Sequence, residues 1–165
     1  MNQMYAEAGV QRKDDIKTMT LRGLIVIGVI LGVLLLLMGG FLGIVGAAIV
    51  VVLIWLYPKL NIEYEYVFVD GQIDFDRITG KAKRKTILRI DMEQVDIVAP
   101  QGSHALDGYT YIQLINKDFS SNSKGSKPYI IIATMEDKKY RISFEPSEKM
   151  LTMMRQKSPR KIAQY

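Results

Sequence analysis

A run without a single charged side chain extends from Gly23 to Pro58 and constrains the fold of this chain more than any other feature. About 18 consecutive apolar residues are enough for a helix that crosses a membrane. As one straight helix the run would be about 54 Å long, whereas the hydrocarbon core of a bilayer is about 30 Å thick. We therefore predict that the run crosses the membrane twice.

The turn of this hairpin is predicted at Gly39-Gly40, near the middle of the run, because glycine reaches positive φ without steric cost. Two helices follow from it, Leu21–Met38 and Phe41–Tyr57, each close to the lower limit for a span of about 17–25 residues. A single steeply tilted helix is the alternative.

The charges around the run predict its orientation. Basic residues flank it on both sides, whereas the Gly-Gly turn has none; they are Arg12, Lys13, Lys17, Arg22, Lys59, Arg77, Lys81, Lys83, Arg84 and Lys85. Loops rich in Lys and Arg stay in the cytoplasm. We therefore expect a multi-pass protein of the cell membrane with both termini cytoplasmic.

Small residues recur at four-residue spacing within the run, which favours close packing of two membrane helices. The predicted helix-packing residues are Gly28, Gly32, Gly39, Gly43 and Ala47. Because the run holds no ionisable side chain, it predicts no proton relay or ion path. The general abundance of glycine in membrane helices is the alternative explanation of the spacing.

The remaining sequence predicts one small domain. The chain has 165 residues, and its 22 Lys and Arg exceed its 17 Asp and Glu only mildly, which fits an anionic membrane surface better than nucleic acid. We divide the chain into an N-terminal cytoplasmic segment, a hairpin, a β-rich domain with a C-terminal helix, and a basic tail; the ranges are 1–20, 21–58, 59–157 and 158–165.

After Lys59 the apolar period becomes two, as in a half-buried strand. Asp70-Gly71 signals a tight hairpin turn. Strands are predicted at about 62–68, 73–76, 83–90, 93–98, 109–116, 129–135 and 139–144, followed by a helix at 147–157. We expect about seven antiparallel strands in a pleckstrin-homology-like (PH-like) barrel or curved sheet, an α+β soluble domain whose C-terminal helix covers its apolar face.

Four segments that follow the hairpin resemble a known family. They are LNIEYEYVFVDGQIDFDRI (60–78), KAKRKTI (81–87), VDIVAPQGSHALDGY (95–109) and FEPSEKML (144–151). This order resembles a family of short clostridial-type membrane proteins with a two-helix hairpin and a PH-like domain. The resemblance implies a bacterial membrane protein of uncharacterised role, and it implies no catalytic residues.

The densest basic cluster is KAKRK, and its candidate lipid contacts are Lys81, Lys83, Arg84 and Lys85. Each such charge near an anionic leaflet adds about 1 kcal/mol of attraction. The three lysines are expected on one strand face with Arg84 opposite. A charged edge strand that resists aggregation is the alternative, and the absence of interleaved aromatic residues argues against nucleic acid.

The segment from Pro100 to Tyr109 is the candidate partner-binding loop, because it interrupts two predicted strands with polar residues. Its candidate contacts are Gln101, Ser103, His104 and Asp107. His104 is the single histidine and the chain has no cysteine, so a zinc site is not expected. Three polar residues within five positions do not easily supply a catalytic triad.

Asp74 and Asp76 project from one face of a predicted strand, and Asp70 is near. Such a group could hold a cation weakly, but the solvated face of a hairpin explains it equally well. We therefore predict no catalytic residue, metal, cofactor or small-molecule substrate.

The resulting hypothesis is a non-enzymatic integral membrane protein. Its β-rich domain would bind a protein partner or another copy of itself at the cytoplasmic face. The alternative is anionic-lipid or envelope-stress sensing through residues 81–85, and an enzyme is the third hypothesis.

Overall fold

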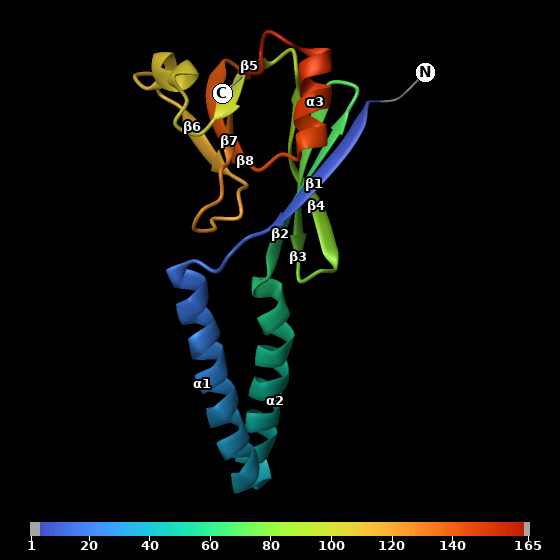
Figure 1. Cartoon of the computed structure of the whole chain (residues 1–165). Helices are drawn as coiled ribbons and strands as arrows, with labels where there is room; N and C mark the ends of the chain where they lie inside the picture. The colour runs from blue at the N-terminus through green and yellow to red at the C-terminus, as the bar shows by residue number, and fades with distance from the viewer. Residues whose placement is uncertain (1–3, 164–165) are drawn as a thin grey trace. The chain divides into compact units, whose positions relative to one another are not determined.

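The computed structural model describes residues 4–163 and divides into two compact units. The helical unit contains residues 13–62 and 79–83, and the β unit contains the other described residues. Two apolar helices therefore precede a β-rich domain, as predicted (Figure 1).

The helical unit consists of α1 (Ile16–Met38), α2 (Gly40–Leu56) and the short 3-10 helix η1 (Tyr57–Leu60). Gly39 and Gly40 have φ of 70° and 58°, which confirms the predicted glycine turn. The first helix begins five residues earlier than expected, because Asp15 caps it: an Asp15 carboxylate oxygen accepts a hydrogen bond from the Ile16 amide at 2.8 Å.

Glycines bring the two helices together. A Cβ built at Gly32 would lie 2.8 Å from Val50, and one built at Gly28 would lie 2.7 Å from Leu53. The tightest approach involves Gly46, whose added Cβ would collide with the Gly32 carbonyl and the Leu36 amide. Gly46 was not among the predicted packing residues.

The other predicted packing residues take different places. Gly43 is buried in the interface, and a Cβ built on it would lie 3.2 Å from the Leu36 carbonyl. Ala47 is only half-buried. Gly39 makes the turn and has open space around it.

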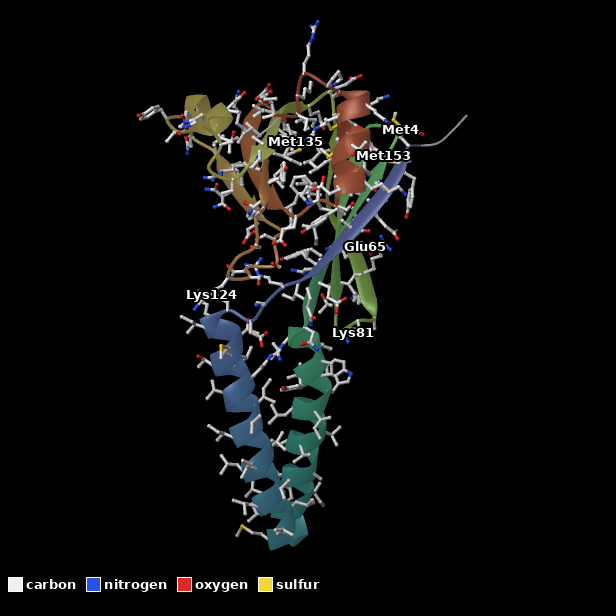
Figure 2. All side chains as sticks on the ribbon, viewed as in Figure 1. Met4, Glu65, Lys81, Lys124, Met135 and Met153 are labelled. Carbon is white, nitrogen blue, oxygen red and sulfur yellow. The ribbon has the colours of Figure 1, made fainter. Side chains whose placement is uncertain are left out.

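Both helices are long and apolar enough to cross a membrane, by length and composition alone. Most of their side chains point outward and are exposed in the isolated chain. Figure 2 shows these side chains as almost entirely carbon along the two helices, which suits a hydrocarbon surrounding.

The β unit is built on two four-stranded sheets, drawn in Figure 1. The first has the order β1-β2-β3-β4, with bounds Tyr5–Gln11, Ile62–Val69, Gln72–Thr79 and Lys83–Asp91. The second has the order β5-β7-β8-β6, with bounds Val95–Pro100, Tyr129–Met135, Lys138–Phe144 and Ile115–Asp118. The remaining elements are η2 (His104–Tyr109) and α3 (Glu148–Lys157).

Aromatic side chains form the core between the sheets. Phe144 of β8 contacts Tyr66 of β2 and Phe75 of β3, with ring centroids 5.6 and 5.8 Å apart. Phe119, just after β6, stacks on Phe75 at 4.9 Å. The helix α3 adds three buried residues, Met150, Leu151 and Met154, as its apolar face predicted.

The predicted fold class, two apolar helices and a β-rich domain with a C-terminal helix, is confirmed. Its details differ: the described residues form eight strands in two sheets that are not closed into a barrel, whereas about seven strands in one barrel or curved sheet were expected. The sequence analysis missed β1, which pairs with β2 from Tyr5↔Val69 to Gln11↔Glu63. Ala6, Ala8 and Val10 of β1 alternate with exposed residues, but only Ala6 is fully buried, so the alternation rests on small side chains and is a weak signal.

The predicted strand at 109–116 is also wrong. This stretch begins in η2 and a turn, and only Ile115–Asp118 forms a strand, β6. That strand pairs with β8 in parallel, through Asn116↔Arg141 among others, and not in the expected antiparallel way.

Candidate functional site

The basic cluster does not lie on one strand face. Lys81 sits in the β3–β4 turn with φ of 58°, while Lys83 and Lys85 belong to β4; all three are exposed. Arg84 is bound within the sheet: its Nε donates to Asp76 at 2.6 Å, and its Nη2 lies 3.2 Å from Glu65. Only the lysines of this cluster are therefore without an acidic partner among the described residues.

The paired aspartates are held by arginines. Asp76 is 5% exposed and faces Arg84, and the hydrogen bond from the guanidinium raises the pKa of Arg84. Asp74 accepts two bonds of 2.7 Å from Arg89, whose pKa is raised for the same reason. Within residues 4–163 no three acidic or histidine side chains come together as a metal site would require.

The candidate partner loop folds into a turn and η2. Gly102 has φ of 85°, and the Ser103 hydroxyl accepts from the Ala105 amide at 3.3 Å, so it caps η2. His104 Nδ1 lies 3.1 Å from Asp107, and both side chains are exposed. Among the described residues, no hydrogen bond joins the Ser103 hydroxyl to His104.

A surface cleft of about 470 Å³, the loop cleft, separates this loop from the outer face of the second sheet. Its floor is apolar: Ile130 and Ile132 of β7 are buried on the side of the sheet opposite the aromatic core. Leu106 of η2 lines the facing wall. Ser103 and Asp107 line the cleft. Gln101 lies outside it, and its backbone amide donates a hydrogen bond to the Pro128 carbonyl at 2.9 Å.

Arg141 of β8 supplies a positive charge to the loop cleft. It lies between Ile132 and Asn116 in the sheet and is half-buried. Among the residues that the structure describes, none forms an ion pair or a hydrogen bond with the Arg141 guanidinium. Lys139, two residues before, is instead 3.0 Å from Asp96.

The segment after η2 carries exposed apolar side chains. Tyr111 is 96% exposed, and Ile112 and Ile115 are about two-fifths exposed. Apolar surface next to a cleft with an unpaired cation is typical of a site that a partner covers. The predicted loop contributes Ser103 and Asp107 to the lining of this cleft, whereas Arg141 and Tyr111 were not singled out from the sequence.

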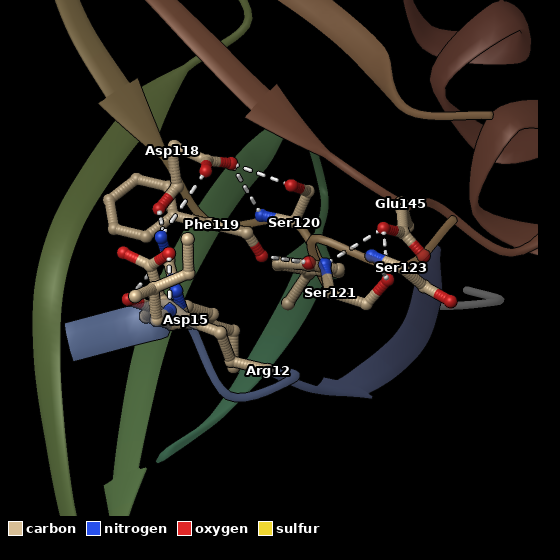
Figure 3. A network of polar contacts seen from close by, with 11 residues as sticks. Arg12, Asp15, Asp118, Phe119, Ser120, Ser121, Ser123 and Glu145 are labelled. Carbon is tan, nitrogen blue, oxygen red and sulfur yellow. Dashed lines mark hydrogen bonds and ion pairs between the residues drawn. The ribbon is translucent and has the colours of Figure 1, made fainter. Parts of the chain in front are cut away.

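A polar network, shown in Figure 3, holds the segment after β6 in place. Arg12 lies 3.5 Å from the Asp118 carboxylate and donates to the Asp118 carbonyl at 3.1 Å. The Ser121 amide and hydroxyl both donate to Glu145 at 2.8 Å. These contacts join β1, β6 and the chain after β8, so they position the sheet edge beside the cleft.

A family model described as a bacterial PH-like domain (DUF6106) matches residues 2–164. This match supports the expected resemblance at the level of a bacterial family, and it covers nearly the whole chain. No curated protein and no solved structure matches the chain.

Proposed function

Since the chain belongs to the family of bacterial PH-like domains (DUF6106), we propose that it is a non-enzymatic integral membrane protein that docks a protein partner on its β unit at the cytoplasmic face. The loop cleft is the docking site. The observation that carries the proposal is the unpaired Arg141 in a cleft with an apolar floor, flanked by exposed Tyr111.

The hairpin supports an anchoring role. Both helices are apolar enough to cross a membrane, and no Asp, Glu, Lys, Arg or His lies between Gly23 and Pro58. Basic residues lie before and after the hairpin and not at its turn, which favours cytoplasmic ends. An anchor of this kind leaves the binding of a protein partner to the β unit.

Single cysteines test the topology, because the natural chain has none. Met38→Cys at the turn is expected to react with a membrane-impermeant maleimide added outside intact cells. Lys149→Cys on α3 is expected to react only after the cells are opened. Labelling of Lys149→Cys from outside would contradict the cytoplasmic placement.

Photo-crosslinking of the full chain in its native membrane tests the docking site. A benzophenone amino acid at Tyr111 is expected to give one defined product, and the same group at exposed Lys149 is expected not to. Arg141→Glu should abolish the product, while Lys138→Glu, an exposed cation of the same strand, should not. A product of twice the chain mass would identify self-association, and equal products at both positions would contradict a specific site.

Anionic-lipid contact through residues 81–85 is the second candidate function. It is favoured by the position of the β3–β4 turn within the helical unit: the Gly80 amide donates to the Asn61 carbonyl, directly after η1, at 3.0 Å. An environment-sensitive dye on Lys83→Cys is expected to shift when nanodiscs of phosphatidylcholine are replaced by nanodiscs containing phosphatidylglycerol. A salt-insensitive or absent shift would remove this candidate.

A further inference from the structure

The helical unit contains an apolar crevice between α1 and α2, at the end away from the glycine turn. It has a volume of about 350 Å³ and is lined by Val26, Val29, Ile30, Ile54, Tyr57 and Pro58, with Ile25 beside them. We propose that this crevice and the basic residues at its mouth bind one anionic phospholipid, with an acyl chain in the crevice and the headgroup against Lys59 and Lys81.

The crevice opens away from the turn because the closest glycine contacts between the helices lie nearer the turn. Gly32 and Gly46 allow close approach there, and Gly28 still lies against Leu53. Towards the far end the lining consists of branched and aromatic side chains such as Val26, Ile54 and Tyr57. These side chains hold the helices apart, so an apolar groove remains between them.

The β3–β4 turn, which carries Lys81, lies against one wall of the crevice. A Cβ built at Gly80 lies 3.4 Å from the Pro58 carbonyl and 3.8 Å from the Lys59 Cα. Pro58 also lines the crevice, so the turn that carries Lys81 contacts the outer side of a residue that forms the crevice wall. In the described part of the chain, Lys59 and Lys81 make no ion pair, and Lys59 lies over the Trp55 ring.

Arg22 adds a second donor at the same end. Its Nη2 reaches Asp14 at 2.9 Å and the Asn61 side chain at 2.7 Å, which satisfies one side of the guanidinium. Its Nε is buried and has no partner among residues 4–163, and its guanidinium lies 5.6 Å from the Tyr57 ring centroid. A buried donor beside an apolar groove suits a phosphate or ester oxygen.

The surroundings and the charges select the occupant. This inference rests on the proposed membrane insertion, in which lipid acyl chains surround the hairpin. Trp55 and Tyr57 are residue types that lie at the headgroup level, so the mouth of the crevice lies there too. A zwitterionic headgroup leaves the unpaired lysines uncompensated, whereas an anionic headgroup neutralises them.

Native mass spectrometry of the full chain, released from nanodiscs with equal phosphatidylcholine and phosphatidylglycerol, tests the site. The natural chain is expected to retain one phosphatidylglycerol. Val29→Phe and Ile54→Phe each fill the crevice and should reduce that retained population about tenfold or more. Leu34→Phe places the same side chain at an exposed position outside the crevice and should leave that population unchanged.

The double variant Lys59→Gln, Lys81→Gln tests the headgroup. It should abolish the preference for phosphatidylglycerol while one lipid is still retained. Equal retention in the crevice-filling variants and in Leu34→Phe, with helix content unchanged by circular dichroism, would overturn the proposal. So would an unchanged lipid preference in the double variant. Failure of the membrane anchor itself is read separately, by the labelling of Met38→Cys from outside the cell.

Discussion

The Tyr66 hydroxyl of β2 donates a hydrogen bond to the backbone carbonyl of Phe119, which follows β6 in the other sheet. Tyr66 is fully buried in the aromatic core, and its ring contacts Phe144 of the second sheet. A single tyrosine therefore joins the two sheets by a polar and an apolar contact, and its ionisation would break the polar one.

The β unit should lose stability in alkali through Tyr66. Burial raises the pKa of Tyr66 above its ordinary value of 10.0, so the folded state favours the protonated phenol. The stability from this preference is complete below about pH 10 and decreases as the pH rises further. Thermal unfolding of the full chain at about pH 9 and about pH 11 should show this loss, and Tyr66→Phe should show a smaller one. Tyr111→Phe, at an exposed position, should behave as the natural chain.

Arg84→Ala should destabilise the first sheet, whereas Arg89→Ala should have little effect. Arg84 neutralises the buried Asp76, so its removal leaves a carboxylate without a partner, at a cost of about 1–3 kcal/mol. The partner of Arg89 is Asp74, which water can solvate after the arginine is removed. Hydrogen exchange of β3 and β4 in the full chain measures the difference, and Asp76→Asn should partly rescue Arg84→Ala. Equal exchange in the two arginine variants would contradict this assignment.

Gly46→Leu should separate the two helices of the hairpin. The new side chain would collide with the Gly32 carbonyl and with Leu35, and overpacking of this kind costs about 1–3 kcal/mol. Gly23→Leu is the matched control, because nothing lies within 4 Å of a Cβ at Gly23. Titration of the detergent-solubilised chain with SDS, followed by far-UV circular dichroism, should show earlier loss of helix only for Gly46→Leu. Identical titrations would show that the glycine contact does not hold the hairpin.

Arg12→Gln should loosen β6. Arg12 bonds the Asp118 carbonyl and carboxylate at the end of this four-residue strand, and its loss should cost about 1 kcal/mol. Faster hydrogen exchange at Ile115–Asp118 is the expected readout. Lys13→Gln removes the neighbouring charge and should leave the exchange rate at these residues unchanged. An equally large increase in Lys13→Gln would instead indicate a general effect of charge.

Local patterns predicted much of the fold. The Asp70-Gly71 turn, the strands that flank it and the β7–β8 hairpin agree with the prediction, because alternation and turn residues act over a few positions. The helix ending at Lys157 was also predicted, although Ser147 is its N-cap and Pro146 lies before the cap. Strand β1 was missed because its pairing with β2 depends on residues more than fifty positions away.

The candidate site was predicted only in outline. The loop at 101–108 marked the region of the loop cleft, since polar residues between strands are visible in a sequence. Arg141 was not singled out, because its role depends on having no partner in the folded chain. Lys81 was singled out as part of a basic cluster, but the contact of its turn with Pro58 was not predicted, because it follows from the packing of the turn against η1.

The sequence by itself determined that this chain contains two apolar helices joined at Gly39-Gly40 and a β-rich domain with a C-terminal helix. Hydrophobicity and glycine conformations are properties of neighbouring residues, so they can be read along the chain. The tertiary structure alone decided which cations are paired, where β1 and β6 join their sheets, and where the crevice opens between the helices. Those features depend on distances between residues that the chain order does not bring together.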